Sequence, residues 1–151
     1  MAKEIERKFL VTDQSYKQLA ERKEEMRQAY ISAAIDATVR LRITDDKAFL
    51  TVKTRNLDVV RDEWEYEIPV SDAEEMLQKC ARTSILSKTR WLVGPWMVDE
   101  YHGHLEGLAV AEIELKTAEE PVPHVDFIGK EVSDDPRYFN STLALADRIP
   151  D

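Results

Sequence analysis

Residues 3–11 read Lys3-Glu-Ile-Glu-Arg-Lys-Phe-Leu-Val11, and two kinds of side chain alternate along them. Glu4, Glu6 and Lys8 fall on one side, and more apolar residues fall between them on the other. A period of two is typical of a β-strand whose faces meet different surroundings. The stretch therefore predicts a strand with one charged face.

Six further segments alternate in the same way. They are residues 38–44, 48–55, 62–68, 87–93, 96–101 and 110–116. For one strand taken alone, a sheet with one wet face is the simpler interpretation. Here the charges are sorted by strand, because the segments around Arg40 and Lys88 carry only cations and those around Glu65 and Asp99 only acids. A solvated face usually mixes its signs, so the sorting indicates a site with a metal side and an anion side.

The spacing of these charges suits that chemistry. Two carboxylates at positions i and i+2 of a strand point the same way, about 7 Å apart. Several such pairs can supply the oxygen ligands that Mg²⁺ or Mn²⁺ prefers. Lysine and arginine in the same cavity would hold phosphate oxygens. A closed barrel is a natural container, because inward and outward residues alternate on every strand.

Helices are expected between the strands. Residues 13–27 are interpreted as a helix with Asp13 or Ser15 as its cap. Ser71-Asp-Ala-Glu74 reads as a capping box in front of an apolar run. Asn140 is expected to cap a short helix that carries residues 143–145.

Composition limits the classes of function. The chain has 151 residues, which fits a single domain over 1–151, and a formal net charge of -9. Such an acidic domain is a poor partner for nucleic acid or for an anionic membrane. No apolar run is long enough to span a bilayer. With Cys80 as its single cysteine and no secretory signal, the chain is expected in the cytoplasm. A homodimer is left open.

The charged motifs together resemble the CYTH, or triphosphate tunnel metalloenzyme, superfamily. Glu4-Ile-Glu-Arg-Lys8 matches its N-terminal ExExK motif. The later elements follow in order: Arg40-Leu-Arg42, Thr51-Val-Lys53, Glu65-Tyr-Glu67, Lys88-Thr-Arg90, Asp99 and Glu112-Ile-Glu114. Gly129-Lys-Glu-Val132 and Arg137-Tyr138 are similar to the small bacterial members.

The resemblance implies an α+β fold: a closed eight-stranded antiparallel β-barrel with helices packed outside. It also implies a triphosphate substrate and Mg²⁺ or Mn²⁺. Carried over by position, the metal-side acids are Glu4, Glu6, Asp99, Glu112 and Glu114. The phosphate-side cations are Lys8, Arg40, Arg42, Lys53, Lys88 and Arg90. Glu65 and Glu67 would support catalysis, whereas Glu63, of the same parity, is expected to face solvent. Arg137 and Tyr138 would lie near a segment that closes one mouth.

The function that these expectations favour is hydrolysis of inorganic tripolyphosphate to pyrophosphate and phosphate. A nucleoside or thiamine triphosphatase, or a class IV adenylyl cyclase, is the alternative enzyme, and a polyphosphate-binding module is the non-enzyme alternative. Among the charged strands only Phe49 and Tyr101 are aromatic candidates to receive a base. Loops at 55–61 and 117–128 leave room for a base pocket at the mouths. His102, His104 and Cys80 are interpreted as structural.

Overall fold

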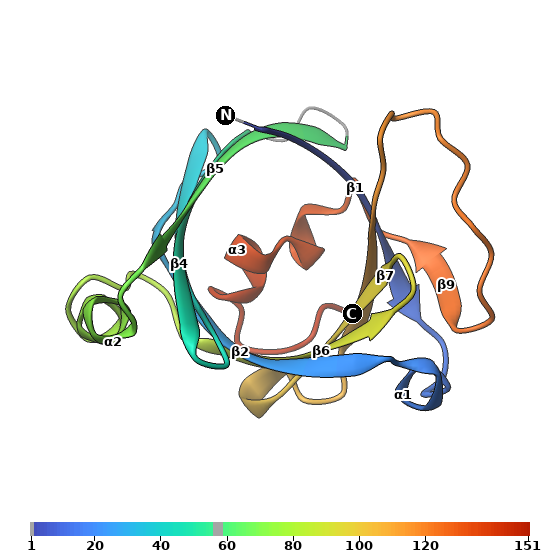
Figure 1. Ribbon diagram of the computed structural model, residues 1–151, viewed down its shortest axis with the longest axis horizontal. Coiled ribbons are helices and arrows are strands. Elements are labelled where there is room, and N and C mark those ends of the chain that lie inside the picture. The colour runs from blue at the N-terminus through green and yellow to red at the C-terminus, as the bar shows by residue number, and fades with distance from the viewer. Residues whose placement is uncertain (1, 56–58) are drawn as a thin grey trace.

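The computed structural model describes residues 2–55 and 59–151. Residues 56–58, part of the loop considered above as one side of a base pocket, lie outside the described residues. The described strands form a ring that is seen end-on in Figure 1. They are β1 (Ala2–Val11), β2 (Arg22–Ala33), β3 (Ala37–Thr44), β4 (Lys47–Thr54), β5 (Val60–Ile68), β6 (Leu86–Val93), β7 (Trp96–Tyr101), β8 (Ala109–Glu114) and β9 (Ile128–Glu131).

The ring is a closed antiparallel barrel. Its order is β5-β4-β3-β2-β6-β7-β8-β1, and pairing of β1 with β5 closes it. Different parts of β1 pair with its two neighbours in the ring: residues 2–5 pair with β5, and residues 6–10 pair with β8. The ninth described strand, β9, lies outside the ring and pairs antiparallel with the C-terminal end of β1. The predicted eight-stranded barrel is confirmed.

The expected helix over residues 13–27 is wrong. Only Tyr16–Leu19 form a helix, α1, and residues 22–33 form β2. The segment is rich in Glu, Lys, Arg and Gln, which favour helices locally. Pairing with β3 on one side and β6 on the other overrides that preference. β2 supplies the eighth strand of the ring, which the alternation of the other seven segments did not include.

The two other expected helices exist, but their caps differ from the predictions. α2 spans Val70–Lys79 with Pro69 at the cap position, where it makes no side-chain capping hydrogen bond, and Ser71 lies inside the first turn. α3 spans Asn140–Leu143 with Phe139 at its cap position. The side chain of Asn140 instead accepts a hydrogen bond from the Tyr101 hydroxyl.

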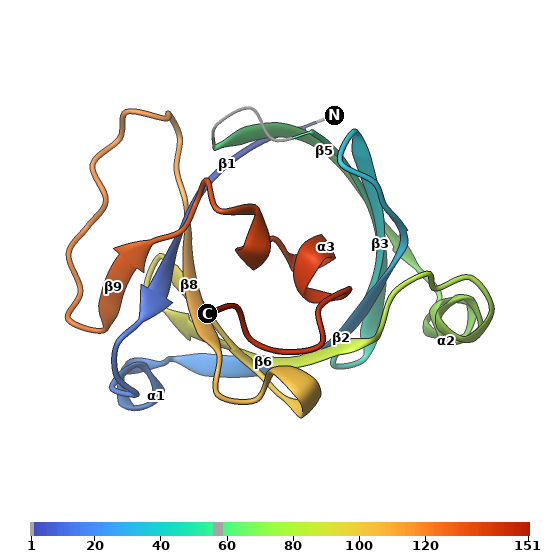
Figure 2. The same ribbon diagram turned by 180° about the vertical axis from the view of Figure 1, so that it is seen from behind.

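Helices occupy both sides of the barrel wall, which corrects the expectation that all of them pack outside. α2 covers the outer face, where Ala73 and Leu77 pack against Leu41 and Ile43. The C-terminal segment, with the 3-10 turn η2 (Pro136–Tyr138) and α3, lies inside the ring in both views (Figures 1 and 2). Leu143 there joins an apolar cluster with side chains of the barrel strands. One mouth is therefore filled by the chain itself.

None of the described helices is both long and apolar enough to cross a membrane.

Candidate active site

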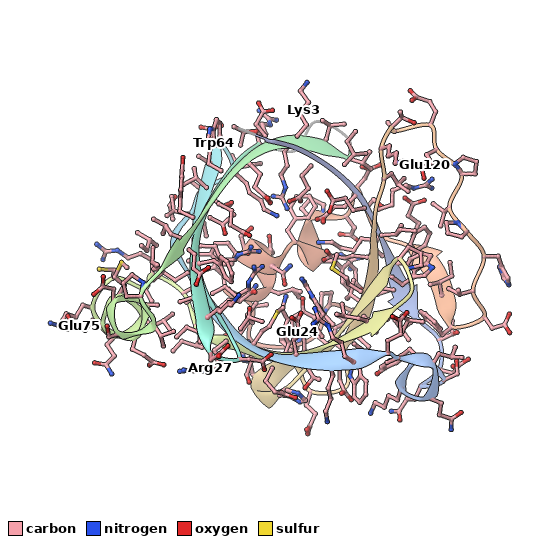
Figure 3. The ribbon with its side chains drawn as sticks, viewed as in Figure 1. Lys3, Glu24, Arg27, Trp64, Glu75 and Glu120 are labelled. Atoms are coloured by element: carbon pink, nitrogen blue, oxygen red, sulfur yellow. The ribbon has the colours of Figure 1, made fainter. Side chains whose placement is uncertain are left out.

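A cavity of about 250 Å³ lies inside the ring. Figure 3 shows side chains with nitrogen and oxygen tips filling the ring, with Glu24 directed inward and Arg27 outward. Among the described residues, six acids line the cavity: Glu4, Glu6, Glu63, Glu65, Glu112 and Glu114. Five cations from the inward faces of the strands also line it: Arg40, Arg42, Lys53, Arg61 and Arg90. Lys3 borders the cavity as well, but its side chain is exposed and points out of the ring in Figure 3. The period-two sorting of the sequence thus converges on one space.

Two neighbouring strands bring the metal-side acids together. Glu6 of β1 lies directly opposite Glu114 of β8, and Lys8 lies opposite Glu112. Directly opposite residues on one sheet face have Cβ atoms about 4.5–5.5 Å apart. The i, i+2 spacing then places Glu4 on the same face of β1 as Glu6. These four carboxylates therefore share one wall of the cavity.

Cations from β4 and β5 meet this acidic wall where the barrel closes. Nζ of Lys53 lies 2.7 Å from Oε2 of Glu4 and 3.3 Å from Oε2 of Glu63. Arg61 approaches both β1 acids, with Nε 3.5 Å from Oε1 of Glu4 and Nη2 3.7 Å from Oε1 of Glu6. All these groups are at least half-buried, so the pairs are screened less than surface ion pairs. The two signs interleave here instead of standing apart.

Glu65 organises the arginines of β3. Its Oε2 lies 3.6 Å from Nη2 of Arg40 and 3.7 Å from Nη2 of Arg42, and it accepts a 2.8 Å hydrogen bond from the Thr51 hydroxyl. Burial and the nearby Arg40 lower the pKa of Arg42 to about 10, although Glu65 opposes that shift. Phe49, considered as a base receptor, lies under the Arg42 guanidinium, 5.2 Å from ring centre to Cζ. Both arginines therefore line the cavity beside Glu65.

Asp99 lies deeper, between two cations of β6. Its Oδ2 is 2.7 Å from Nζ of Lys88, and its Oδ1 is 2.7 Å from Nε of Arg90. Asp99 and Lys88 are each only 1% exposed, and neither lines the cavity. Burial acts to raise the pKa of Asp99, but Arg90 and Lys88 together hold it well below its usual range. This geometry favours an anchoring role for Asp99 over the metal-binding role expected from the sequence.

Lys8 connects the site to the C-terminal segment. Its Nζ lies 3.6 Å from Oε1 of Glu112, donates to the Tyr138 carbonyl at 3.5 Å, and lies 5.9 Å from the centre of the Phe139 ring. Tyr138 is buried in the apolar cluster of the closed mouth. Arg137 is exposed and pairs with Asp135. In this segment Tyr138 is therefore packed inside the apolar cluster, and Arg137 lies on the exposed side.

The alternation along each strand predicted most, but not all, of the residues that line the cavity. Glu63, expected to face solvent, lines the cavity because β5 begins at Val60 and pairs Glu63 with Lys53. Glu67 is exposed and does not line the cavity, since it lies farther along β5 toward the open mouth. Arg61 was missed, although it shares the parity of Glu63 and Glu65. Tyr101, the second aromatic candidate for a base, is buried behind the cavity.

The acidic wall fits a divalent cation by the chemistry of its donors. Among residues 2–55 and 59–151, no three acids, histidines or cysteines already converge as a metal-ligand cluster. Repulsion nevertheless remains within the wall: burial and the nearby Glu4, Glu6 and Glu112 raise the pKa of Glu114, although Lys53 opposes the shift. A cation among hard carboxylate ligands would relieve it. His102 is not part of this wall: its Nε2 shares a 2.8 Å hydrogen bond with the Thr89 hydroxyl, whose side chain alternates with the inward Lys88 and Arg90.

A closed antiparallel barrel around a charged cavity defines a tunnel fold. The CYTH domain family matches residues 2–140, so the chain belongs to the CYTH family. An inorganic triphosphatase of Acetivibrio thermocellus is 44% identical over 147 residues, covering 95% of this chain and 94% of the relative. An inorganic triphosphatase of Nitrosomonas europaea is 31% identical, covering 95% and 97%.

Solved structures agree with the fold. A crystal structure of an inorganic triphosphatase superposes with a TM-score of 0.64 at 29% identity, covering 95% of this chain and 99% of that one. A putative adenylyl cyclase from Hippeastrum with a dominant triphosphatase activity superposes with a TM-score of 0.58 at 16% identity, covering 77% and 81%. At that identity the second likeness supports the fold alone.

Proposed function

We propose that this chain hydrolyses inorganic tripolyphosphate to pyrophosphate and phosphate with the help of Mg²⁺ or Mn²⁺. Both curated relatives described above are inorganic triphosphatases that match nearly the whole chain. The observation that carries the proposal is the cavity of about 250 Å³, in which six acids face five cations from the inward faces of the strands. A short, densely charged anion with a divalent counter-ion suits such a space.

The cations are proposed to hold the phosphate groups. Arg40, Arg42, Lys53 and Arg90 present donors into the cavity from three strands, and Lys8 and Lys88 add charge just behind its surface. Such donors stabilise the charge of a phosphoryl group more in its transition state than in the ground state when they are held in place. Asp99 and Glu65 hold four of these cations before the substrate arrives.

The acids of β1 and β8 are proposed to hold the metal. Glu4, Glu6, Glu112 and Glu114 would be its ligands, because they share one wall and carry hard oxygen donors. When bound there, a divalent cation offsets substrate charge and polarises a phosphoryl oxygen. A carboxylate of the same wall would accept a proton from the attacking water and orient it.

A nucleoside triphosphate is the weaker candidate substrate. Tyr30 and Phe139 are the aromatic residues that line the described cavity, and Phe139 lies near Lys8 on the C-terminal segment. A base placed there would have to lie against the segment that fills the mouth. Misaligned phosphates react slowly, so the bulk of a nucleoside is expected to reduce turnover.

The test is a phosphate-release panel with tripolyphosphate, pyrophosphate, ATP, GTP and thiamine triphosphate at equal concentrations. Each is measured with Mg²⁺, with Mn²⁺ and with a chelator, and the ATP reaction is also analysed for cyclic AMP. Tripolyphosphate should be cleaved fastest, only with metal, and without cyclic AMP. Faster release from ATP or thiamine triphosphate, or accumulation of cyclic AMP, would establish the corresponding alternative. Metal-independent binding without turnover would indicate a binding module.

We further propose that the enzyme works in the cytoplasm, since its single cysteine, Cys80, is free and has no partner for an internal disulfide. Fractionation of cells with an antibody against the chain tests this. Sedimentation of the purified protein measures whether it is a monomer or a homodimer.

A further inference from the structure

Gln28 on β2 is a polar side chain without a polar partner. It is 0% exposed, and neither its Oε1 nor its Nε2 has a hydrogen-bond partner among the described residues. Gln28 lies directly opposite Arg42 of β3, whose side chain lines the cavity. Opposite residues of an antiparallel pair share one face of the sheet, so Gln28 points into the barrel behind the phosphate-side cations.

Packing alone does not explain an amide at this position. A buried polar group that lacks a partner destabilises the folded state, and an apolar residue of similar volume would avoid that cost. Two of its neighbours belong to an apolar cluster: Leu86 lies directly opposite on β6, and Tyr30 lies two residues along β2. The amide therefore indicates a partner that is engaged in another state of the protein.

Arg42 offers that partner. The Nε of Arg42 is buried and likewise without a hydrogen-bond partner among the described residues, whereas its Nη2 faces Glu65 at 3.7 Å. An arginine offers only donors and an amide oxygen is an acceptor, so Oε1 of Gln28 complements this N–H. With Cβ atoms about 4.5–5.5 Å apart, the two side chains are within reach of each other after a small rotamer change.

We propose that Gln28 is a positioning residue for triphosphate binding. When the anion draws Arg42 away from Glu65, Oε1 of Gln28 accepts a hydrogen bond from Nε of Arg42 and fixes the plane of the guanidinium toward a phosphate group. Gln28 does not line the cavity and touches no reacting atom. This inference rests on the proposed function, because it requires an anion beside Arg42.

The test compares Gln28→Met, which keeps the length and volume and removes the amide, with the control Leu86→Met at the opposite buried position. Thermal unfolding is followed in a chelator, with and without tripolyphosphate, and steady-state kinetics are measured with Mg²⁺. Gln28→Met should unfold at the same or a higher temperature than the wild type without ligand. Its tripolyphosphate-induced rise in Tm should fall to less than half, and its KM should increase about tenfold with kcat changed less than threefold. Leu86→Met should bind tripolyphosphate like the wild type.

A second comparison isolates the contact with Arg42. Arg42→Lys keeps the positive charge and removes the Nε–H, so adding Gln28→Met to it should raise KM no further. A full additional tenfold loss in that background would overturn the proposed contact. Wild-type tripolyphosphate binding by Gln28→Met, or a clear loss of ligand-free stability or of folding, would also overturn it.

Arg40→Ala separates this failure from failure of the proposed function. If Arg40→Ala weakens binding of tripolyphosphate but Gln28→Met does not, the anion site stands and the role of Gln28 is wrong. If neither variant weakens binding, the anion lies elsewhere, and both proposals are wrong.

Discussion

Replacing Asp99 with asparagine removes the negative charge from the most deeply buried ion pairs of the barrel. Lys88 Nζ and Arg90 Nε each lie 2.7 Å from an oxygen of Asp99, and Arg90 Nη2 lies 3.0 Å from Oδ2. The side chains of Asp99 and Lys88 are 1% exposed, and that of Arg90 is 13% exposed. Lys88 would then lose a counter-ion where water cannot replace it, and Arg90 would lose one at the wall of the cavity.

The expected loss of stability is large. Removing one partner of a buried ion pair lowers the free energy of unfolding by about 3–5 kcal/mol. Asparagine keeps the volume and one hydrogen-bond acceptor, so the loss for Asp99→Asn should be at the lower end, about 3 kcal/mol. For a domain of this size, each kcal/mol lowers Tm by about 2–4 °C, so Tm should fall by about 6–12 °C. The control is Glu131→Gln, which removes a partly exposed carboxylate paired with Arg7 and should cost less than about 1 kcal/mol.

The assay is thermal and guanidinium unfolding in a chelator, followed by circular dichroism from neutral to acid pH. Because the folded-state pKa of Asp99 lies below its unfolded value, its stabilisation is present above the unfolded value and is lost as pH falls through the folded one. The difference between wild type and Asp99→Asn should therefore persist down to about pH 4, near the unfolded pKa of aspartate, and shrink below it.

The opposite result would restore the metal role predicted from the sequence. If Asp99→Asn is as stable as the wild type in a chelator but loses most of the stabilisation that Mg²⁺ gives, Asp99 is a metal ligand. The anchoring interpretation of its ion pairs would then be wrong.

Four further outcomes are expected. Glu4→Gln or Glu6→Gln should abolish metal-dependent phosphate release while the circular dichroism spectrum stays that of the wild type; near wild-type rates at limiting Mg²⁺ would remove that residue from the metal site. Arg40→Ala and Lys88→Ala should each raise KM and lower kcat by at least about tenfold, and unchanged kinetics in both would move the anion site elsewhere. Glu114→Gln should raise Tm in a chelator at pH 7. The folded-state pKa of Glu114 is raised above its unfolded value, so ionisation of this carboxyl makes the folded state less stable as pH rises above the unfolded pKa. The gain in Tm should vanish below about pH 4, and a gain that persists there would contradict this cause. Calorimetry should show tripolyphosphate binding more tightly with Ca²⁺ than in a chelator, and equal affinities would exclude coupling between metal and anion.

The strands could be predicted because a barrel exposes each one to two unlike surroundings, and seven segments record this as a period of two. β2 was not predicted because its residues favour a helix locally. Its strand state depends on pairing with β3, which follows directly, and with β6, which is far away in sequence. The cap of α3 was not predicted for a related reason. Asn140 faces Tyr101 across the closed mouth, and that contact exists only after the C-terminal segment enters the ring.

Parity also predicts which side of the wall a charge faces, but not its depth along the tunnel. Glu63 and Glu67 have the same parity, yet Glu63 pairs with Lys53 in the cavity and Glu67 lies exposed toward the open mouth. Depth depends on register and on the stagger of the strands, which one sequence does not contain. Arg61 could have been found by starting β5 two residues earlier, since it would then continue the inward series of Glu63 and Glu65.

Barrel closure explains why the sorted charges of the sequence become interleaved in the structure. The pairing of β1 with β5 brings the acidic β1 against Arg61, and Lys53 reaches Glu4 across β5. Without ligands, each sign offsets the desolvation of the other, so a charged interior is compatible with a stable fold. Under the proposed function the same pairs would compete with the ligands, because Glu4 could bind a metal fully only when Lys53 leaves it, and Lys53 would then be free for a phosphate group. By linkage, whatever a metal gained in binding free energy from this exchange the anion would gain equally. A tunnel built this way would favour a substrate that arrives with its metal over either one alone.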